Sequence, residues 1–86
     1  MVRKPKIVII GVGSASFGLA CLRDAFTTKE LWGSELVFVD LDVVALERMT
    51  KAAIRINEEL NAGFKISKTV NRYEAFSGAD FVITSI

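Results

Sequence analysis

The sequence predicts an α/β fold in which one parallel sheet is doubly wound, with helices packed on both of its faces. Three observations lead to this fold class. Short apolar runs alternate with longer segments whose apolar residues recur every three or four positions. Of the 86 residues, 51% are hydrophobic and only one is proline, a composition that excludes disorder and favours a packed core. A stretch of glycine, serine and alanine joins the first apolar run to the first helical segment.

The first half of the chain is predicted to form a strand, a helix and a second strand. Lys6–Ile10 is a continuous run rich in β-branched residues, which is typical of a parallel strand buried on both faces. A helix is expected from Ser14 or Ala15 to about Thr28, because apolar residues there recur at helical spacing. Residues 36–39 form the second apolar run and are predicted to be a buried strand. The apolar stripe of the helix comprises Phe17, Cys21, Leu22, Ala25 and Phe26.

The second half is predicted to contain a long helix, a third strand, a short helix and a fourth strand. Val43–Leu60 is the clearest helix, and residues 64–70 alternate as a half-exposed edge strand would. Residues 71–76 allow one or two helical turns with Asn71 as the cap, and residues 79–86 are a fourth apolar run. The apolar face of the long helix is expected to comprise Leu46, Met49, Ala53, Ile56 and Leu60.

The predicted order is β-α-β-α-β-short α-β, with right-handed crossovers between parallel strands. We treat residues 1–86 as one domain, because no linker, repeat or low-complexity tract interrupts them. The sequence stops at the carboxyl end of the fourth predicted strand, where ligands sit in open α/β sheets and where a further loop is expected. We therefore expect the N-terminal portion of a larger protein.

The small-residue turn after the first strand has the context of a dinucleotide-binding turn of the Rossmann type. Gly11 allows a sharp turn out of the strand, and Gly13 leaves room for a pyrophosphate near the backbone. The helix that follows offers N–H groups and a partial positive charge to the phosphates. Ser16 stands where the fingerprint has its third small residue, and Gly18 is a second candidate for close helix–strand packing. The alternative is a tight connection chosen for its geometry alone.

Asp40 follows the second strand at roughly the spacing, about 20 residues, at which an acid reads the adenine ribose. A carboxylate there accepts hydrogen bonds from ribose hydroxyls and repels a 2′-phosphate, so NAD is expected in preference to NADP. Asp42 lies nearer the helix start and is expected to cap it. The fourth strand should also border the cofactor. We therefore expect the cofactor to contact Gly11, Val12, Gly13, Ser14, Ala15, Ser16, Phe17, Asp40, Thr84 and Ser85.

Composition excludes several other functions. The net charge is +1, from eleven basic and ten acidic residues, which argues against a nucleic-acid-binding protein. With one cysteine and no histidine, a four-ligand zinc site and an internal disulfide are excluded. The first 22 residues resemble a signal peptide in having a basic start and an apolar run, but the glycines and serines argue against it and against a membrane span. A reducing, cytoplasmic location is expected, and Cys21 is read as a packing residue.

Three segments resemble the start of family 4 glycoside hydrolases. They are KIVIIGVGSASF at residues 6–17, VFVDLD at residues 37–42 and GADFVI at residues 78–83. The likeness spans essentially the whole chain, and it is closest to the α-glucosidase, α-galactosidase and α-galacturonidase members. The chain is more distantly similar to lactate and malate dehydrogenases, which share the Rossmann-like fold. The first segment is moderately specific, whereas the third is common across the dehydrogenase group.

The resemblance implies an enzyme that uses NAD and a divalent metal, usually manganese, on a small-molecule glycoside, and that assembles as a homo-oligomer. Such enzymes oxidise the sugar at C3, remove the C2 proton, eliminate the glycosidic oxygen, add water and return the hydride, unlike most glycosidases. The metal ligands and catalytic base of that family lie beyond this chain, so no catalytic or metal residue is expected here. Two alternatives remain open, a fragment of an NAD-dependent 2-hydroxy acid dehydrogenase and a non-catalytic nucleotide-sensing module.

Overall fold

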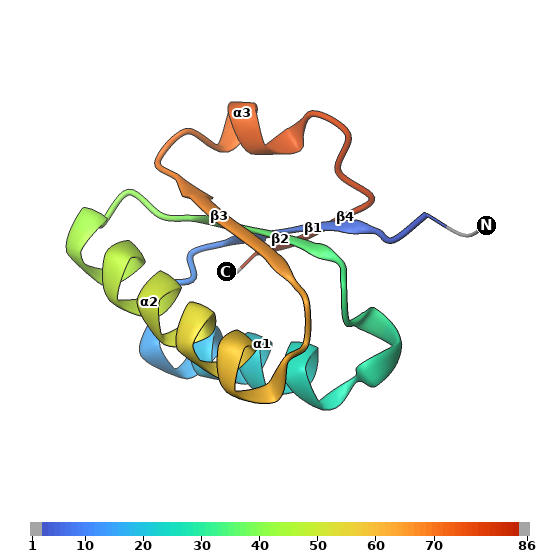
Figure 1. Cartoon of the computed structure of the whole chain (residues 1–86). Helices are drawn as coiled ribbons and strands as arrows, with labels where there is room; N and C mark the ends of the chain where they lie inside the picture. The colour runs from blue at the N-terminus through green and yellow to red at the C-terminus, as the bar shows by residue number, and fades with distance from the viewer. Residues whose placement is uncertain (1–2, 85–86) are drawn as a thin grey trace.

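The computed structural model describes residues 3–84 of the chain. Its elements alternate between strands and helices along the whole of that range (Figure 1). In chain order they are β1 (Lys6–Ile10), α1 (Ala15–Thr27), the 3-10 turn η1 (Lys29–Leu31), β2 (Glu35–Val39), α2 (Val43–Leu60), β3 (Lys65–Thr69), α3 (Arg72–Phe76) and β4 (Phe81–Thr84).

The four strands form one parallel sheet in the order β3-β2-β1-β4. Each neighbouring pair is parallel, with Val8 of β1 opposite Val37 of β2 on one side and Val82 of β4 on the other. Helices α1 and α2 cover one face of the sheet, and α3 lies on the other (Figure 1). The α/β class and the doubly wound Rossmann-like sheet expected from the sequence are confirmed.

Strand residues alternate between two hydrophobic clusters, as the two-residue period of a strand requires. Ile7 and Ile9 of β1 and Phe38 of β2 belong to the larger cluster, which they share with α1 and α2. Val8 and Val37 belong to the smaller one, which Ala75 of α3 covers. Both faces of β1 and β2 are therefore buried, which explains why these two strands read as continuous apolar runs.

Two elements differ from what their apolar patterns suggested. Leu60 was expected on the buried face of α2, but it is 46% exposed as the last residue of the helix. Strand β4 was expected to start at residue 79. It begins at Phe81 and forms the second edge of the sheet, opposite β3, with all four of its residues exposed. Within residues 3–84, the apolar side chains of β4 are therefore only partly buried.

The helix ends follow local chemistry. Asp42 accepts a hydrogen bond from the Ala45 N–H at 3.1 Å and caps α2, as expected. Asn61 ends the same helix in the left-handed conformation, with φ of 56°. Asn71 caps α3 by accepting from the Tyr73 N–H at 2.9 Å. No helix among residues 3–84 is long and apolar enough to cross a membrane.

Candidate functional site

The turn after β1 brings the chain sharply from the sheet to the start of α1. Gly11 has φ of 86°, a left-handed conformation that glycine adopts without strain. Its N–H donates to the Val39 carbonyl oxygen at 2.8 Å, and its own carbonyl oxygen accepts from the Ser14 N–H at 3.1 Å. The turn is thus fixed against the end of β2 at the carboxyl edge of the sheet. This is the edge at which ligands bind in open α/β sheets.

The N-terminus of α1 is open at this edge. Ser14 is the N-cap residue, but its side chain makes no capping hydrogen bond. The side chains of Ser14, Ala15 and Ser16 are all small and exposed. The first N–H groups of a helix have no partner within the helix, and here no N-cap side chain covers them. An anion that approaches this end meets N–H donors and the positive end of the helix dipole.

Two of the expected contact residues turn their side chains inward. Val12 is fully buried in the larger hydrophobic cluster, so only its backbone is available to a ligand at the turn. Phe17 is half-buried and packs against the same cluster. The aromatic ring of Phe17 therefore anchors the first turn of α1 to the core.

Asp40 joins the turn to the start of α2. Its Oδ2 accepts from the Gly13 N–H at 2.8 Å, and its Oδ1 accepts from the Asp42 N–H at 2.9 Å. The Asp40 carboxylate thus contacts the turn through the Gly13 N–H. Each oxygen already holds one backbone N–H, and each retains a lone pair for a further donor.

The structure gives a packing reason for glycine at position 13, in addition to the room for a pyrophosphate that we expected. A Cβ there would lie 2.7 Å from Asp40 Oδ2 and 2.8 Å from the Ala45 Cβ. The side chain of any other residue would therefore collide with this chain's own atoms. Gly13 allows the turn to approach Asp40 and α2 closely, and this requirement exists before any pyrophosphate is bound.

Close packing of α1 depends on Gly18 and not on Ser16. A Cβ on Gly18 would collide with the Val12 carbonyl oxygen and would lie 2.7 Å from the Met49 Cε. Ser16 stands at the third position of the fingerprint but is exposed. The helix–strand packing expected of Ser16 is thus supplied by Gly18, which the sequence indicated only as a second candidate.

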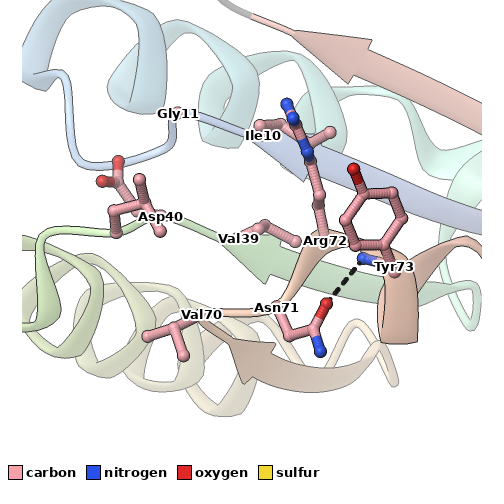
Figure 2. A pocket seen from close by; sticks show the side chains of 9 residues that line it. Ile10, Gly11, Val39, Asp40, Val70, Asn71, Arg72 and Tyr73 are labelled. Carbon is pink, nitrogen blue, oxygen red and sulfur yellow. Dashed lines mark hydrogen bonds between the residues drawn. The ribbon is translucent and has the colours of Figure 1, made fainter.

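A pocket of about 520 Å³ opens beside Asp40 at the carboxyl ends of β1, β2 and β3 (Figure 2). The corner between β3 and α3 forms one of its walls, and no residue of this corner was expected at the site from the sequence. A usable signal was present, since Asn71 and its neighbours follow the carboxyl end of a parallel strand. The pocket is lined by Ile10, Gly11, Val39, Asp40, Leu41, Val70, Asn71, Arg72 and Tyr73.

Arg72 places a positive charge in the pocket, which matters for the choice between NAD and NADP. The three residues that follow Asp40 in the sequence, Leu41, Asp42 and Val43, include no cation. In the structure, Arg72 extends across the pocket toward Ile10, and Asp40 lies at the opposite side near Gly11 (Figure 2). The Arg72 Cζ lies 5.6 Å from the centre of the Tyr73 ring, a cation–π contact. A cation and a carboxylate therefore line the same pocket.

The last expected contacts lie at the end of β4. Thr84 is exposed and pairs in register with Ile10, which places it at the same edge of the sheet as the turn. Ser85 lies outside the described residues. Thr84 thus borders the turn on the side away from Asp40.

Asp80 fastens the beginning of β4 to the N-terminal segment, away from the pocket. It accepts from the Lys6 N–H at 2.7 Å and pairs with Arg3 at 2.7 Å. The side-chain hydrogen bond from Arg3 is the main cause, and the hydrogen bond from the Lys6 N–H the second, that lower the pKa of Asp80 from its ordinary value.

Cys21 lies on α1, away from the pocket. Burial is the main cause, and the nearby Asp24 carboxylate the second, that raise the pKa of the Cys21 thiol. Among residues 3–84, no group of three or more histidine, cysteine or acidic side chains is placed to hold a metal ion.

Comparison with known proteins gives consistent matches. The model of family 4 glycosyl hydrolases matches residues 6–86. An alpha-glucosidase from Erwinia rhapontici is 42% identical over 81 residues, which are 94% of this chain and 18% of that protein. A structure of 6-phospho-alpha-glucosidase from gut microorganisms with NAD and Mn²⁺ aligns with a TM-score of 0.84 at 20% identity, over 98% of this chain and 19% of that one.

A second structure of 6-phospho-alpha-glucosidase from gut microorganisms, with NAD and glucose-6-phosphate, has a TM-score of 0.67 at 27% identity. It aligns with 99% of this chain and 19% of its own. The chain therefore spans about a fifth of the length of these relatives.

Proposed function

The chain belongs to family 4 of the glycosyl hydrolases, and from this we propose that it is the NAD-binding portion of a longer enzyme that cleaves α-glycosides. The match of the family model to residues 6–86 is the observation that carries the proposal. One curated relative is an alpha-glucosidase, and two of the solved neighbours are NAD complexes of 6-phospho-alpha-glucosidase. We propose a glycoside substrate of this class and, because a single cysteine cannot form an internal disulfide and suits a reducing compartment, a cytoplasmic location.

The residues of the carboxyl edge fit an extended dinucleotide. The open N-terminus of α1, with small side chains at Ser14 and Ser16, suits the pyrophosphate. The Asp40 carboxylate, fixed by two backbone N–H groups, suits the hydroxyls of the adenine ribose. Thr84 is placed on the side of the turn away from Asp40, where the nicotinamide half of an extended cofactor would run. The NAD contacts named from the sequence remain our proposal, with Val12 limited to its backbone.

NAD, when bound, supplies a hydride acceptor, so that a sugar carbon can be oxidised and then reduced within one turnover without net oxidation. The contribution of this chain is to bind and orient the cofactor. One solved neighbour contains Mn²⁺, but residues 3–84 provide no metal-binding cluster. We assign neither a metal ligand nor a catalytic residue to the described part of the chain.

Cofactor dependence of hydrolysis tests this proposal. The protein should be purified from its native source, its intact mass measured, and its bound NAD removed by extensive dialysis. We expect a mass several times 9.4 kDa, loss of α-glycoside hydrolysis after NAD removal, and recovery when NAD is added. Deuterium at C2 or C3 of the sugar should slow turnover if transfer of either hydrogen limits the rate. Full hydrolysis by NAD-free enzyme would contradict the redox mechanism.

The dehydrogenase alternative predicts a different result in the same preparation. An enzyme of that class would accumulate NADH when supplied with NAD and a 2-hydroxy acid. A redox-assisted glycosidase returns its hydride, so we expect no net NADH during hydrolysis. Steady NADH production with a 2-hydroxy acid, without glycoside hydrolysis, would replace the proposed function with a dehydrogenase.

A further inference from the structure

The corner between β3 and α3 places a guanidinium and an aromatic ring beside the expected ribose site. We propose that Arg72 stacks on the adenine ring of the cofactor, so that this chain binds the adenylate half of NAD as a unit. The inference deepens the proposed function and rests on it, because it assumes that the carboxyl edge binds NAD. It assigns a role to residues that neither the glycine turn nor the acid after β2 indicated.

The pocket has the size and the surfaces that a planar base needs. Its volume of about 520 Å³ lies within the usual range for small-ligand sites, about 300–1,000 Å³. Leu41 is 86% exposed and Val70 is 49% exposed, although both are apolar. These two side chains flank the pocket together with Ile10 and Val39. A bound aromatic ring would remove their apolar surface from water, which favours binding of a base over binding of a free sugar or phosphate.

The connectivity of the cofactor places the base in this pocket. In a dinucleotide the adenine ribose lies between the base and the pyrophosphate. If the pyrophosphate lies at Gly11 and the start of α1, and Asp40 holds the ribose, then the base must lie on the far side of Asp40 from α1. The pocket wall there consists of Leu41, from the loop after β2, and of the corner after β3.

Arg72 has a free planar group at this wall. Within residues 3–84 its guanidinium forms no ion pair, and its contact there is the cation–π contact with Tyr73 at 5.6 Å. The hydrogen bond from the Tyr73 N–H to Asn71 fixes the backbone of the corner that presents both side chains (Figure 2). Guanidinium planes stack on nucleobases as they do on aromatic rings. A base inserted beside Arg72 would give this unpaired cation a second aromatic neighbour.

The competing role for Arg72 is to bind a 2′-phosphate, as in NADP-dependent enzymes. The geometry favours stacking, because the Asp40 carboxylate is fixed at the ribose position by Gly13 and Asp42 and would repel a phosphate there. The two roles differ in what they require of the side chain. Stacking needs the guanidinium plane, whereas attraction of a phosphate needs only the positive charge, which lysine also carries.

The test uses the 86-residue chain with three probes: ADP-ribose, nicotinamide mononucleotide and 2′,5′-ADP. Calorimetry gives affinities, and saturation-transfer NMR shows which ligand protons lie against the protein. Three variants are compared with the parent chain, namely Arg72→Lys, Arg72→Leu and, as a control, Arg55→Leu. Arg55 is an exposed arginine on α2 and does not line the pocket. Circular dichroism checks that each variant is folded, and Arg72→Lys keeps a long cationic side chain if Arg72→Leu fails to fold.

We expect ADP-ribose to bind with the strongest saturation on the adenine H2 and H8 protons, and nicotinamide mononucleotide to bind far more weakly. Both Arg72 variants should weaken ADP-ribose binding by roughly tenfold, and Arg55→Leu should not. Unchanged affinity in both Arg72 variants would overturn the stacking role but leave the proposed function intact. Tighter binding of 2′,5′-ADP than of ADP-ribose, retained by Arg72→Lys, would assign Arg72 to a phosphate instead. No binding of ADP-ribose by the parent chain would overturn both proposals.

Discussion

Asp40 has a role in the fold that is separate from its proposed role in binding the ribose of NAD. Its two oxygens hold the Gly13 and Asp42 N–H groups, so the carboxylate fixes the turn before a cofactor arrives. Asp40→Asn keeps the shape but turns an NH₂ group toward one of these N–H donors. We expect a loss of about 1–3 kcal/mol in the free energy of unfolding, together with weaker NAD binding. Urea denaturation and calorimetry measure the two effects.

The same change from aspartate to asparagine at Asp42 provides the control. Asp42→Asn changes the same functional group at the N-cap of α2, where asparagine caps about as well as aspartate. We expect a change in unfolding free energy within about 0.5 kcal/mol and unchanged NAD affinity. Equal losses for both variants would mean that Asp40 has no special role at the turn.

Gly18 is the second residue on which the geometry of the site depends. An added Cβ would meet the Val12 carbonyl oxygen, a backbone atom, and the Met49 side chain, so α1 would have to move away from the turn. We predict that Gly18→Ala lowers the free energy of unfolding by about 1–3 kcal/mol, a typical cost of overpacking. Ser16→Ala, at an exposed position of the same helix, should stay within about 0.5 kcal/mol. Equal urea midpoints for the two variants would contradict this account of the packing.

At the scale of elements, Asp80 attaches β4 to the N-terminal segment through charge. The Arg3 and Lys6 donors lower the pKa of Asp80, so the folded state favours the ionised carboxyl. A lowered pKa contributes stability that is present above the unfolded value, about 3.9, and is lost as the pH falls through the lower folded value. We predict that the stability difference between the parent chain and Asp80→Asn is largest above about pH 5 and shrinks toward pH 2. Denaturation at a series of pH values measures it, and a difference independent of pH would contradict the assignment.

The elements themselves were largely predictable, because their signals are local. Continuous apolar runs gave β1 and β2, the stripe from Leu46 to Ala53 gave α2, and Asp42 and Asn71 marked two helix starts. The exposure of Leu60 and the edge position of β4 were not predictable, since both depend on which elements lie nearby and not on the periodicity of the segment.

One part of the candidate site, formed by the turn and Asp40, was predictable from the sequence, and the corner after β3 was not. The turn and Asp40 belong to a recognisable motif whose parts have fixed spacing along the chain. Arg72 and Tyr73 reach the pocket because the carboxyl end of β3 lies two strands from β1, which is a property of the sheet order. Likewise, the packing reason for Gly13 could not be read from the motif, because it depends on the positions of Asp40 and Ala45 across the turn.

For the molecule as a whole, β4 leaves an apolar edge. Phe81, Val82 and Ile83 are 58%, 48% and 42% exposed, and edge strands of this kind pair with other chains. We predict that the 86-residue chain associates at high concentration and that Val82→Lys reduces this association. Leu19→Lys, which changes an exposed leucine on α1, should have a smaller effect. Sedimentation velocity over a concentration series measures both, and a chain that is monomeric throughout would contradict the prediction.

The most direct test of the whole account is an NMR titration of the isotopically labelled 86-residue chain with NAD. The account predicts amide shift changes that cluster at residues 11–17, at Asp40 and Leu41, and at the corner formed by residues 70–73. These three segments are distant in sequence and meet only at the carboxyl edge of the sheet. An absence of saturable shifts, or shifts confined to another surface such as the groove beside Glu47 and Lys51 on α2, would contradict it.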